Sequence, residues 1–265
     1  ILKSLRMLPV YRIRDGFNVI SKNNDIFKTC SELLKSNEAI VIFPEGSHNL
    51  NRTVRPLSKG FTRIVFDTLE MYPSLDLHLI PVGLNYKNPE KFVDEVSMHF
   101  GKPLKSQDFV THDRNLDVIK LKNSVHQSIS QLTTHIPPSE YDKTLKKLLS
   151  LKVDFLNPQL VNKCISKNFE GCSSHKESRL SSLKQFFKKL LIINLWLPYF
   201  IWKQFIEPKI HEIEFISTFR FTVAITLVPF YLLIITGLLS LVFSWLWALM
   251  YFIFVLGLAL LAIKL

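Results

Sequence analysis

The chain has 265 residues, of which 48% are apolar, and its 33 basic and 22 acidic side chains give a net charge of +11. The charges are unevenly placed, because no charged residue lies between Arg220 and Lys264. A basic, charge-bearing part followed by an uncharged apolar part excludes a purely cytosolic enzyme, a disordered chain and a small disulfide-rich secreted module. The chain opens at Ile1 without a methionine, so we expect further sequence upstream of it.

The first 135 residues alternate short apolar runs with segments of helical periodicity. The expected elements are an extended segment over Leu8–Ile13, helices over Asp25–Ser36 and Lys59–Met71, and strands over Ala39–Phe43, Leu77–Leu84 and Val96–Phe100. The run Ala39–Phe43 has the β-branched and aromatic composition of a strand buried on both faces. In the last strand we expect Met98 and Phe100 to face the core and His99 to face outward. This order predicts an α/β fold with largely parallel strands.

The second half of the chain is predicted to be helical. Helices are expected over 115–135 and 139–153, whereas 154–182 is polar and has little periodicity. Residues 163–189 carry seven basic and two acidic side chains just before an apolar segment, which suggests contact with anionic lipid headgroups. No recognisable nucleic-acid-binding motif accompanies this charge, and a nucleic-acid partner is not expected.

Two apolar segments follow the basic run. Leu190–Phe205 is short for a membrane span and suits an interfacial or re-entrant helix. Phe221–Ile263 is about twice the length of one span, so it predicts two spans of about 20 residues, with Trp245 and Trp247 near the turn between them. Arg220 and Lys264 would then lie on the same, cytoplasmic side. One long tilted span is the alternative.

The three cysteines, Cys30, Cys164 and Cys172, have no metal-binding spacing and are expected to be unpaired thiols in a reducing compartment. No Gly-rich phosphate loop or cluster of metal ligands is evident, so neither a metal nor a cofactor is expected.

The densest candidate site is Phe43-Pro44-Glu45-Gly46-Ser47, which is followed by Arg52, Arg55 and Lys59-Gly60. A buried strand would end here in a Pro/Gly turn that presents a carboxylate, with cationic side chains close behind. The helix that begins at Lys59 would offer free N–H groups to an anion. This combination suits a phosphorylated polar substrate. From the residues alone, a surface turn with solvated charges is the alternative.

This run resembles the Phe-Pro-Glu-Gly-Thr/Ser motif of the glycerolipid acyltransferases, a family that includes glycerol-3-phosphate and lysophosphatidate acyltransferases. Leu8-Pro9-Val10-Tyr11-Arg12 is similar to the family's second block, and Leu79-Ile80-Pro81-Val82-Gly83 is similar to its fourth. The three blocks stand in the family's order within residues 1–105, and the whole run is most similar to bacterial membrane acyltransferases of this type.

The resemblance implies a substrate site. Arg12 is expected to bind the phosphate, and Glu45, Gly46 and Ser47 are expected to shape the glycerol-phosphate site. The family usually has an arginine directly after Thr/Ser, but His48 stands at this position. We expect a cation from Arg55, with Arg52 as the alternative, to take its place. His48 is either a ligand contact or an ordinary loop residue.

The catalytic base is not expected among these residues. In the family, a His-x4-Asp block precedes the second block, and its histidine deprotonates the acceptor hydroxyl that attacks the acyl thioester. We therefore expect this block upstream of Ile1, and the present 265 residues are expected to be inactive by themselves. His112 and Asp117 have the same spacing, but they follow the fourth block, so we interpret them as a coincidence.

The resemblance thus implies a partial acyltransferase sheet flanked by helices in 1–135, a basic helical connector in 136–189, and a membrane region in 190–265 with an interfacial helix and a transmembrane helical hairpin. The implied activity is transfer of a fatty acyl group from acyl-CoA or acyl-carrier protein to glycerol 3-phosphate or lysophosphatidate in phospholipid biosynthesis. The expected place is a bacterial inner membrane, with membrane lipids as partners and the catalytic domain in the cytoplasm.

Two other classes of protein remain open. One is a membrane-anchored binding or scaffold protein that keeps the acyltransferase fold without catalysis, and His48 is the feature that favours it. The other is a small transporter or membrane assembly factor, although the spans contain no acidic or basic side chain.

Overall fold

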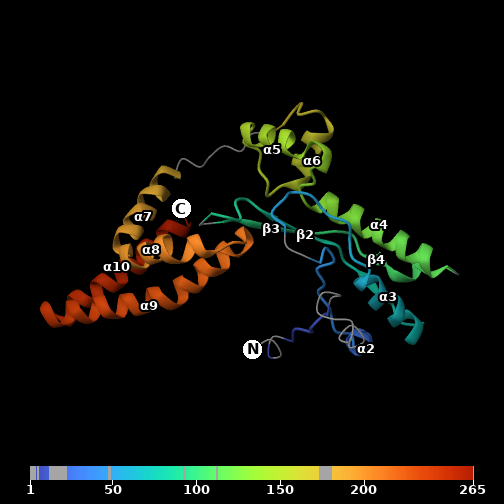
Figure 1. The fold of residues 1–265 in the computed structure, drawn as a ribbon, viewed down its shortest axis with the longest axis horizontal. Helices are drawn as coiled ribbons and strands as arrows, with labels where there is room; N and C mark the ends of the chain where they lie inside the picture. The colour runs from blue at the N-terminus through green and yellow to red at the C-terminus, as the bar shows by residue number, and fades with distance from the viewer. Residues whose placement is uncertain are drawn as a thin grey trace. The chain divides into compact units, whose positions relative to one another are not determined.

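The computed structural model describes residues 4, 6–11, 23–46, 49–91, 94–111, 113–172 and 181–264 (Figure 1). The chain divides into two compact units. The first unit comprises Ile1–Asn85, Ser97–Ser150 and Asn157–Cys172, and the second comprises Tyr86–Val96, Leu151–Leu156 and Ser173–Leu265. The described part is mostly helical, with two small sheets.

Two helices that the periodicity predicts begin the first unit. Helix α2 spans Asn23–Lys35 and helix α3 spans Gly60–Met71. They pack against each other along their length, and Ser31 Oγ and Thr68 Oγ1, both buried, lie 2.8 Å apart in a hydrogen bond. Each of these two buried hydroxyls therefore has a hydrogen-bond partner, as buried polar groups in folded proteins usually do.

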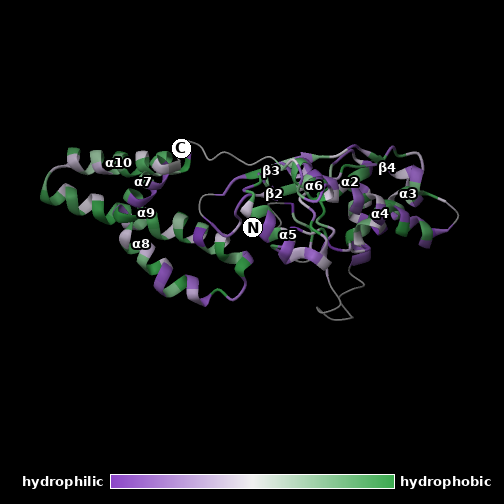
Figure 2. Ribbon diagram, turned by 90° about the horizontal axis from the view of Figure 1, so that it is seen from above, coloured by the Kyte–Doolittle hydropathy of each residue, from purple (hydrophilic) through white to green (hydrophobic). Residues whose placement is uncertain are grey.

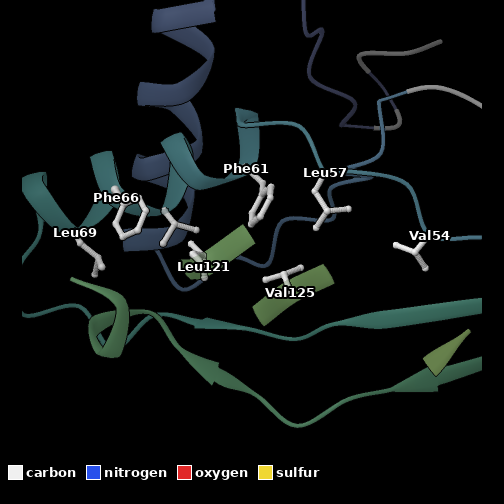
Figure 3. Close-up of a cluster of buried hydrophobic side chains, with 8 residues drawn as sticks. Val54, Leu57, Phe61, Phe66, Leu69, Leu121 and Val125 are labelled. Atoms are coloured by element: carbon white, nitrogen blue, oxygen red, sulfur yellow. The ribbon is translucent and has the colours of Figure 1, made fainter. Parts of the chain in front are cut away.

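Helix α4, Arg114–Leu132, completes the core of this unit. Its N-cap is Asp113, whose side chain accepts hydrogen bonds from the backbone N–H groups of Asn115 and Leu116. The buried apolar side chains that join α3, α4 and the preceding loop are Val54, Leu57, Phe61, Val65, Phe66, Leu69, Leu121 and Val125 (Figure 3). The predicted burial of Ile64, Val65 and Leu69 is confirmed.

The remaining helices of the first unit are short. They are the 3₁₀ turns η2, Ser106–Phe109, and η3, Pro138–Glu140, and the helices α5, Tyr141–Ser150, and α6, Pro158–Ser166. The sequence predicts α4 and α5 but not α6, which lies in the polar stretch 154–182. The side chain of Asn157 caps α6 by accepting from Leu160 N, and Pro158 follows at the first helical position.

The sheet differs from the prediction. Strand β1, His78–Leu79, pairs antiparallel with β4, Leu104–Lys105, and β2, Val82–Tyr86, pairs with β3, Val96–Phe100. Backbone bonds from Gly101 N to Pro81 O (2.8 Å) and from Lys87 N to Glu95 O (2.9 Å) close the second pair at its two ends, which is the antiparallel arrangement. The prediction of a largely parallel sheet is therefore wrong. The single strand predicted over Leu77–Leu84 is divided between β1 and β2 at Pro81, which has no N–H to donate.

Two predictions about strand faces are also wrong. Ala39–Phe43 forms no strand, and Val41 and Phe43 are 81% and 76% exposed. β-propensity describes how well side chains fit a pleated, half-buried surface, and this run has no such surface among the described residues. In β3, Met98 and Phe100 are exposed, whereas Ser97 and His99 are half-buried and lie 3.2 Å apart through Oγ and Nε2.

The carboxyl end of α4 is held by β2. Asn85 is buried, donates from Nδ2 to Leu132 O (2.9 Å) and accepts at Oδ1 from Thr134 N (3.0 Å). Gly83 lies so close to the same turn that a Cβ built on it would be 2.3 Å from Leu132 O. The absence of a side chain at Gly83 therefore allows the helix end to reach the strand.

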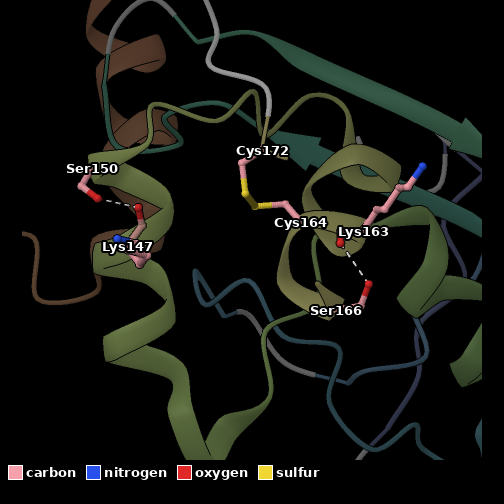
Figure 4. The surroundings of a disulfide bond; sticks show 6 residues. All are labelled: Lys147, Ser150, Lys163, Cys164, Ser166 and Cys172. Atoms are coloured by element: carbon pink, nitrogen blue, oxygen red, sulfur yellow. Dashed lines mark hydrogen bonds between the residues drawn. A yellow bond between two sulfur atoms is a disulfide. The ribbon is translucent and has the colours of Figure 1, made fainter. Parts of the chain in front are cut away.

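A disulfide joins Cys164 in α6 to Cys172, with a Cα–Cα distance of 5.1 Å (Figure 4). The expectation of unpaired thiols is thus wrong for these two residues, while Cys30 is a free, buried thiol. The pairing arises because Asn168, Phe169 and Gly171 all have positive φ and turn the chain back at the end of α6. The bond from Phe169 N to Cys164 O (2.9 Å) belongs to this reversal.

Reducing this disulfide is expected to lower the free energy of unfolding of the first unit by about 2–3 kcal/mol, since it closes a short loop. Of these three cysteines, an alkylating reagent should label only Cys30 in the oxidised, unfolded protein, and it should label all three after reduction. Labelling of three thiols without reductant would contradict the bond. Disulfides persist mainly in oxidising compartments, so the one-thiol result would also weigh against the expected cytoplasmic placement.

The second unit contains an interrupted helical stretch. Helix α7 spans Ser181–Asn194, α8 spans Trp196–Ile201, and the π-helical turn η4 spans Trp202–Ile206. The helix predicted over Leu190–Phe205 lies within it. Pro198 lacks the N–H that would bond to Asn194 O in a continuous helix, and the hydroxyl of Tyr231 donates to that carbonyl instead (3.1 Å).

Two long apolar helices follow the 3₁₀ turns η5, Glu207–Lys209, and η6, Ile213–Phe215. They are α9, Ile216–Val242, and α10, Trp245–Lys264, and the prediction of two helices with Trp245 and Trp247 near the turn is confirmed. By length and composition, Ile213–Val242 and Trp245–Lys264 could each cross a membrane, and both are hydrophobic along most of their length (Figure 2). The residues buried where α10 packs on α7 and α9 are Leu191, Tyr231, Leu232, Val255, Leu258 and Ala262.

Candidate functional site

The site begins at a tight turn after Phe43. Pro44 and Glu45 form the turn, and Gly46 follows with a φ of +75°, a conformation that favours glycine. Ser58 N donates to Pro44 O (2.8 Å), so the chain returns to the turn just before α3 begins at Gly60. The helix expected to begin at Lys59 begins at Gly60, and its first residues follow directly on this contact.

The carboxylate of Glu45 is held by Arg55. Oε2 of Glu45 accepts from Arg55 N (3.2 Å) and lies 3.5 Å from Arg55 Nε. About a third of each side chain is exposed, so the pair is neither sealed in the core nor fully solvated. The guanidinium has five N–H donors in a planar fork, so it can pair with a carboxylate through one edge and bind a second anion through another.

The loop between Glu45 and Ser58 is anchored to the segment after α4. Thr53 Oγ1 donates to Ile136 O (2.6 Å), and Ile136 N donates to Arg52 O (2.8 Å). Arg52 N donates to the hydroxyl of Tyr141 at the start of α5 (2.9 Å). The loop is thus fixed at its middle by residues more than 80 positions further along the chain.

Two histidines bracket the backbone of Val54. Val54 N donates to His135 Nδ1 (3.1 Å), and His126 Nε2 lies 3.2 Å from Val54 O. His135 must therefore be unprotonated at Nδ1. Burial lowers the pKa of His135, and the nearby His126 lowers it further. The two rings meet edge to face with centroids 6.0 Å apart.

Acid is expected to loosen this attachment. Because the pKa of His135 in the folded protein lies below its ordinary 6.5, the unfolded chain binds the proton more readily. The stabilisation that unprotonated His135 gives to the folded protein is complete above about pH 6.5. It is lost as the pH falls from there through the pKa of His135 in the folded protein. Amide hydrogen exchange of the 52–55 segment should therefore be faster at pH 5.5 than at 7.5 after correction for intrinsic rates. In His135→Asn, whose side-chain oxygen accepts without titrating, that difference should shrink; an equal difference in both proteins would contradict this role.

The structure brings together some of the residues that the sequence singles out. Glu45 and Arg55 are in contact, and Gly46 adjoins them. Arg12, Ser47 and His48 lie outside the described residues. The chain just before Arg12 is tied to the start of α2, because Tyr11 N and O bond to the side-chain amide of Asn23 at 2.9 and 2.8 Å.

Asp117 has a role in the fold. It lies in the first turn of α4, is buried, and accepts from Thr111 N (2.9 Å) and Thr111 Oγ1 (2.5 Å). Burial alone would raise the pKa of this carboxyl, but the two hydrogen bonds from Thr111 and the nearby cations Lys120 and Arg114 lower it. His112 lies outside the described residues. A carboxylate committed to two bonds with Thr111 is occupied in holding the start of the helix.

The residues that support the loop were not identified from the sequence. His126, His135 and Tyr141 sit in helical or connecting segments without any motif around them. Their only sequence signal is that the helix predicted over 115–135 contains one histidine, His126, and ends at another, His135. A structural or a functional role would explain this equally well. Their relation to the Glu45 loop depends on the tertiary fold.

Comparison with known proteins gives a partial but consistent answer. The acyltransferase family model matches residues 1–85. An uncharacterized acyltransferase of Schizosaccharomyces pombe is 30% identical over 79 residues, which cover 30% of this chain and 12% of that protein. Glycerol-3-phosphate O-acyltransferases 1 and 2 of Saccharomyces cerevisiae are 29% identical over 79 residues and 23% identical over 124, covering 30% and 45% of this chain and 10% and 16% of theirs.

The chain therefore spans only about a tenth to a sixth of the length of these relatives. They come from yeasts, so they lend no support to the bacterial source that the motifs favoured. No solved structure matches the chain. The three ordered motif blocks and the Glu45 turn lie within residues 1–85, and this part of the chain is similar to the acyltransferase family.

Proposed function

We propose that the protein is a membrane-bound O-acyltransferase that moves a fatty acyl group from a thioester donor, acyl-CoA or acyl-carrier protein, to glycerol 3-phosphate or lysophosphatidate. The observation that carries this proposal is the Glu45–Arg55 pair on a glycine turn, inside the segment that matches the acyltransferase family. The named activity of two of the relatives, glycerol-3-phosphate O-acyltransferase, supports the acceptor class.

In this proposal the loop binds the acceptor. Arg55 and Arg12 contact the phosphate, and bidentate guanidinium–phosphate bonds give it a fixed orientation. Glu45 fixes Arg55, and Gly46 and Ser47 contribute to the glycerol-phosphate site. Deprotonation of the hydroxyl falls to the histidine of the family's His-x4-Asp block, since Asp117 is bonded to Thr111. No covalent intermediate is required, because the thioester is already activated.

Membrane association follows from the second unit in this proposal. The helices α9 and α10 expose large apolar side chains over most of their surfaces. In the most apolar part of Ile213–Val242 only 11% of the residues are buried, and in that of Trp245–Lys264 only 22% are. Apolar surface of this extent is stable in lipid rather than in water. We propose that 1–135 form the acyltransferase domain, 136–189 the connector and 190–265 the membrane region, so that amphiphilic donor and product reach the site from the bilayer.

The test is acyl transfer in membranes that contain the overexpressed full-length protein. Labelled glycerol 3-phosphate or lysophosphatidate is supplied with a long-chain acyl-CoA or acyl-carrier protein, and membranes from cells with an empty vector serve as the control. The proposal predicts a labelled product, lysophosphatidate or phosphatidate, above the control. If neither acceptor is acylated by a protein that is folded and present in the membrane, a binding or scaffold protein is the better reading.

A further inference from the structure

One side chain of helix α6 holds the backbone at the end of α4. Asn162 is half-buried in the middle of α6, and its amide makes three hydrogen bonds to this backbone. Its Nδ2 donates to Ser130 O (3.0 Å) and to Thr133 O (2.8 Å), and its Oδ1 accepts from His135 N (3.0 Å). All four residues belong to the first unit. Both N–H groups of the amide and its oxygen are thus engaged in fixing the turn after α4 on α6.

These bonds allow only one orientation of the amide. The two neighbours of Nδ2 are carbonyl oxygens, which accept, and the neighbour of Oδ1 is an N–H group, which donates. A carboxylate of the same size would keep the bond to His135 N but would place an oxygen against the two carbonyls. Asn157, the N-cap of the same helix, differs in this respect. It accepts one bond from Leu160 N (3.3 Å), which a carboxylate accepts equally well.

The turn that Asn162 fixes is the one that carries the loop with Arg55. Residues 135 and 136 hold the loop backbone at 52–54 through hydrogen bonds, among them the bond from Val54 N to His135 Nδ1 (3.1 Å). Arg55 follows directly, and its own N donates to Glu45 Oε2 (3.2 Å). The backbone of Arg55 is therefore placed between the Glu45 turn and residues 135–136, and the position of residue 135 is set by Asn162.

A second asparagine holds the same turn. Asn85 in β2 binds Leu132 O and Thr134 N, on residues that alternate with those that Asn162 binds. The turn thus keeps one attachment to its surroundings when Asn162 is replaced. Loss of the bonds from Asn162 is expected to shift residues 135–136 and the loop bound to them, rather than to unfold the end of α4.

We propose that Asn162 is a positioning residue for the acceptor site, which sets the place of Arg55 through residues 135–136. The inference rests on the proposed function, in which Arg55 binds the phosphate of the acceptor. Guanidinium–phosphate bonds depend on the direction of the N–H groups, so a shifted Arg55 binds the phosphate less tightly. Replacement of Asn162 therefore raises the KM for the phosphorylated acceptor and leaves the KM for the thioester donor unchanged.

Acyl transfer in membranes that contain the full-length Asn162→Asp protein tests this role. The KM for the preferred phosphorylated acceptor should rise about tenfold, and the KM for the thioester donor should stay within about twofold. Asn157→Asp makes the same change of charge in the same helix and should leave both constants within about twofold. An unchanged acceptor KM in Asn162→Asp, or an equal rise in Asn157→Asp, would overturn the inference.

Amide hydrogen exchange of the detergent-solubilised full-length protein adds a readout that does not depend on turnover. Exchange of the 52–55 segment should be about tenfold faster in Asn162→Asp, as after the loss of one hydrogen bond, whereas exchange of α3 should not change. Unchanged exchange at 52–55 would overturn the inference even if acyl transfer is observed. If the unmodified protein transfers no acyl group but exchange at 52–55 responds, the proposed function is wrong and Asn162 still holds the loop.

Thr53→Val is a second variant, and it leaves α6 intact. It removes the bond from Thr53 Oγ1 to Ile136 O (2.6 Å), which joins the loop to the turn from the other side. The acceptor KM should rise about threefold, because the loop is held less firmly beside residues 135–136. An unchanged acceptor KM in Thr53→Val would show that this attachment does not place Arg55, even if Asn162→Asp does not fold.

Discussion

Replacing Glu45 with Gln is expected to lower kcat/KM for acyl transfer about 100-fold, because a misplaced acceptor is attacked far less efficiently. The amide has the same size as the carboxylate but no charge, so it binds Arg55 N and Nε weakly. The loop that carries Arg55 would then lose the contact that joins it to the Pro44–Gly46 turn. The measurement is steady-state transfer to the preferred acceptor in membranes, at matched protein amounts.

The matched control is Glu38→Gln. Glu38 is also a carboxylate in an ion pair, with Arg6 at 3.4 Å, but it lies on the surface before the motif. Its replacement should leave kcat/KM unchanged within about twofold, since exposed pairs contribute little. The unfolding temperature of both variants should stay close to that of the unmodified protein. Undiminished acyl transfer by Glu45→Gln would show that Glu45 is not part of the substrate site.

Replacing Gly83 with Ala is expected to destabilise the first unit by about 3 kcal/mol, as overpacking against a rigid neighbour does. The added Cβ would lie 2.3 Å from Leu132 O and 2.6 Å from Leu132 C, so the helix end would have to move. That movement would also strain the two hydrogen bonds of buried Asn85. Chemical unfolding of the detergent-solubilised protein, followed by hydrogen exchange of α4, measures the effect.

Gly60→Ala is the control for this substitution. Gly60 begins α3, and a Cβ at that position would meet nothing within 4 Å. Alanine has the higher helix propensity, so this variant should be neutral or more stable by up to about 1 kcal/mol. Equal stability of the Gly83→Ala and Gly60→Ala proteins would show that β2 does not hold the end of α4 in the way described.

The sequence predicted the helices well because each has its own periodic signal. The spacing of apolar residues predicted helices whose bounds are close to those of α2, α3, α4 and α5. The absence of charged residues between Arg220 and Lys264 predicted α9 and α10. Helix α6 was missed because it is only nine residues long and lies inside a polar stretch, although its buried residues Val161 and Cys164 follow helical spacing. Its limits depend on Asn157 and Pro158 at one end and on the reversal before Cys172 at the other.

The strands could not be predicted equally well, because a strand needs a partner and the partner is not visible in a local window. Ala39–Phe43 has the composition of a buried strand but remains exposed and unpaired among the residues that the structure describes. In β3, alternation was evident, but it did not reveal which face is covered, and Met98 and Phe100 lie on the exposed side. Pro81 has no N–H to donate and divides the predicted strand into β1 and β2, which the hydrophobic pattern of Leu77–Leu84 does not show.

Two of the candidate residues that lie close together in the sequence also meet in the structure. Glu45 and Arg55 are ten positions apart in one motif, and they form an ion pair. The contacts of His126, His135 and Tyr141 with the loop span more than 70 positions, and no local pattern reports them. The disulfide was not predicted, for a related reason. Positive φ angles at Asn168, Phe169 and Gly171 bring Cys172 back to Cys164, and a local sequence pattern does not reveal such angles.

In the proposed function, the Glu45–Arg55 loop selects a phosphorylated acceptor for acyl transfer. The most direct measurement compares glycerol 3-phosphate and lysophosphatidate with their unphosphorylated counterparts, glycerol and monoacylglycerol, in the unmodified protein and in Arg55→Leu. We expect acylation of a phosphorylated acceptor, with kcat/KM at least about 100-fold above that of its counterpart, and a loss of most of this preference in Arg55→Leu. Equal rates with and without the phosphate, or an unchanged preference in Arg55→Leu, would contradict it.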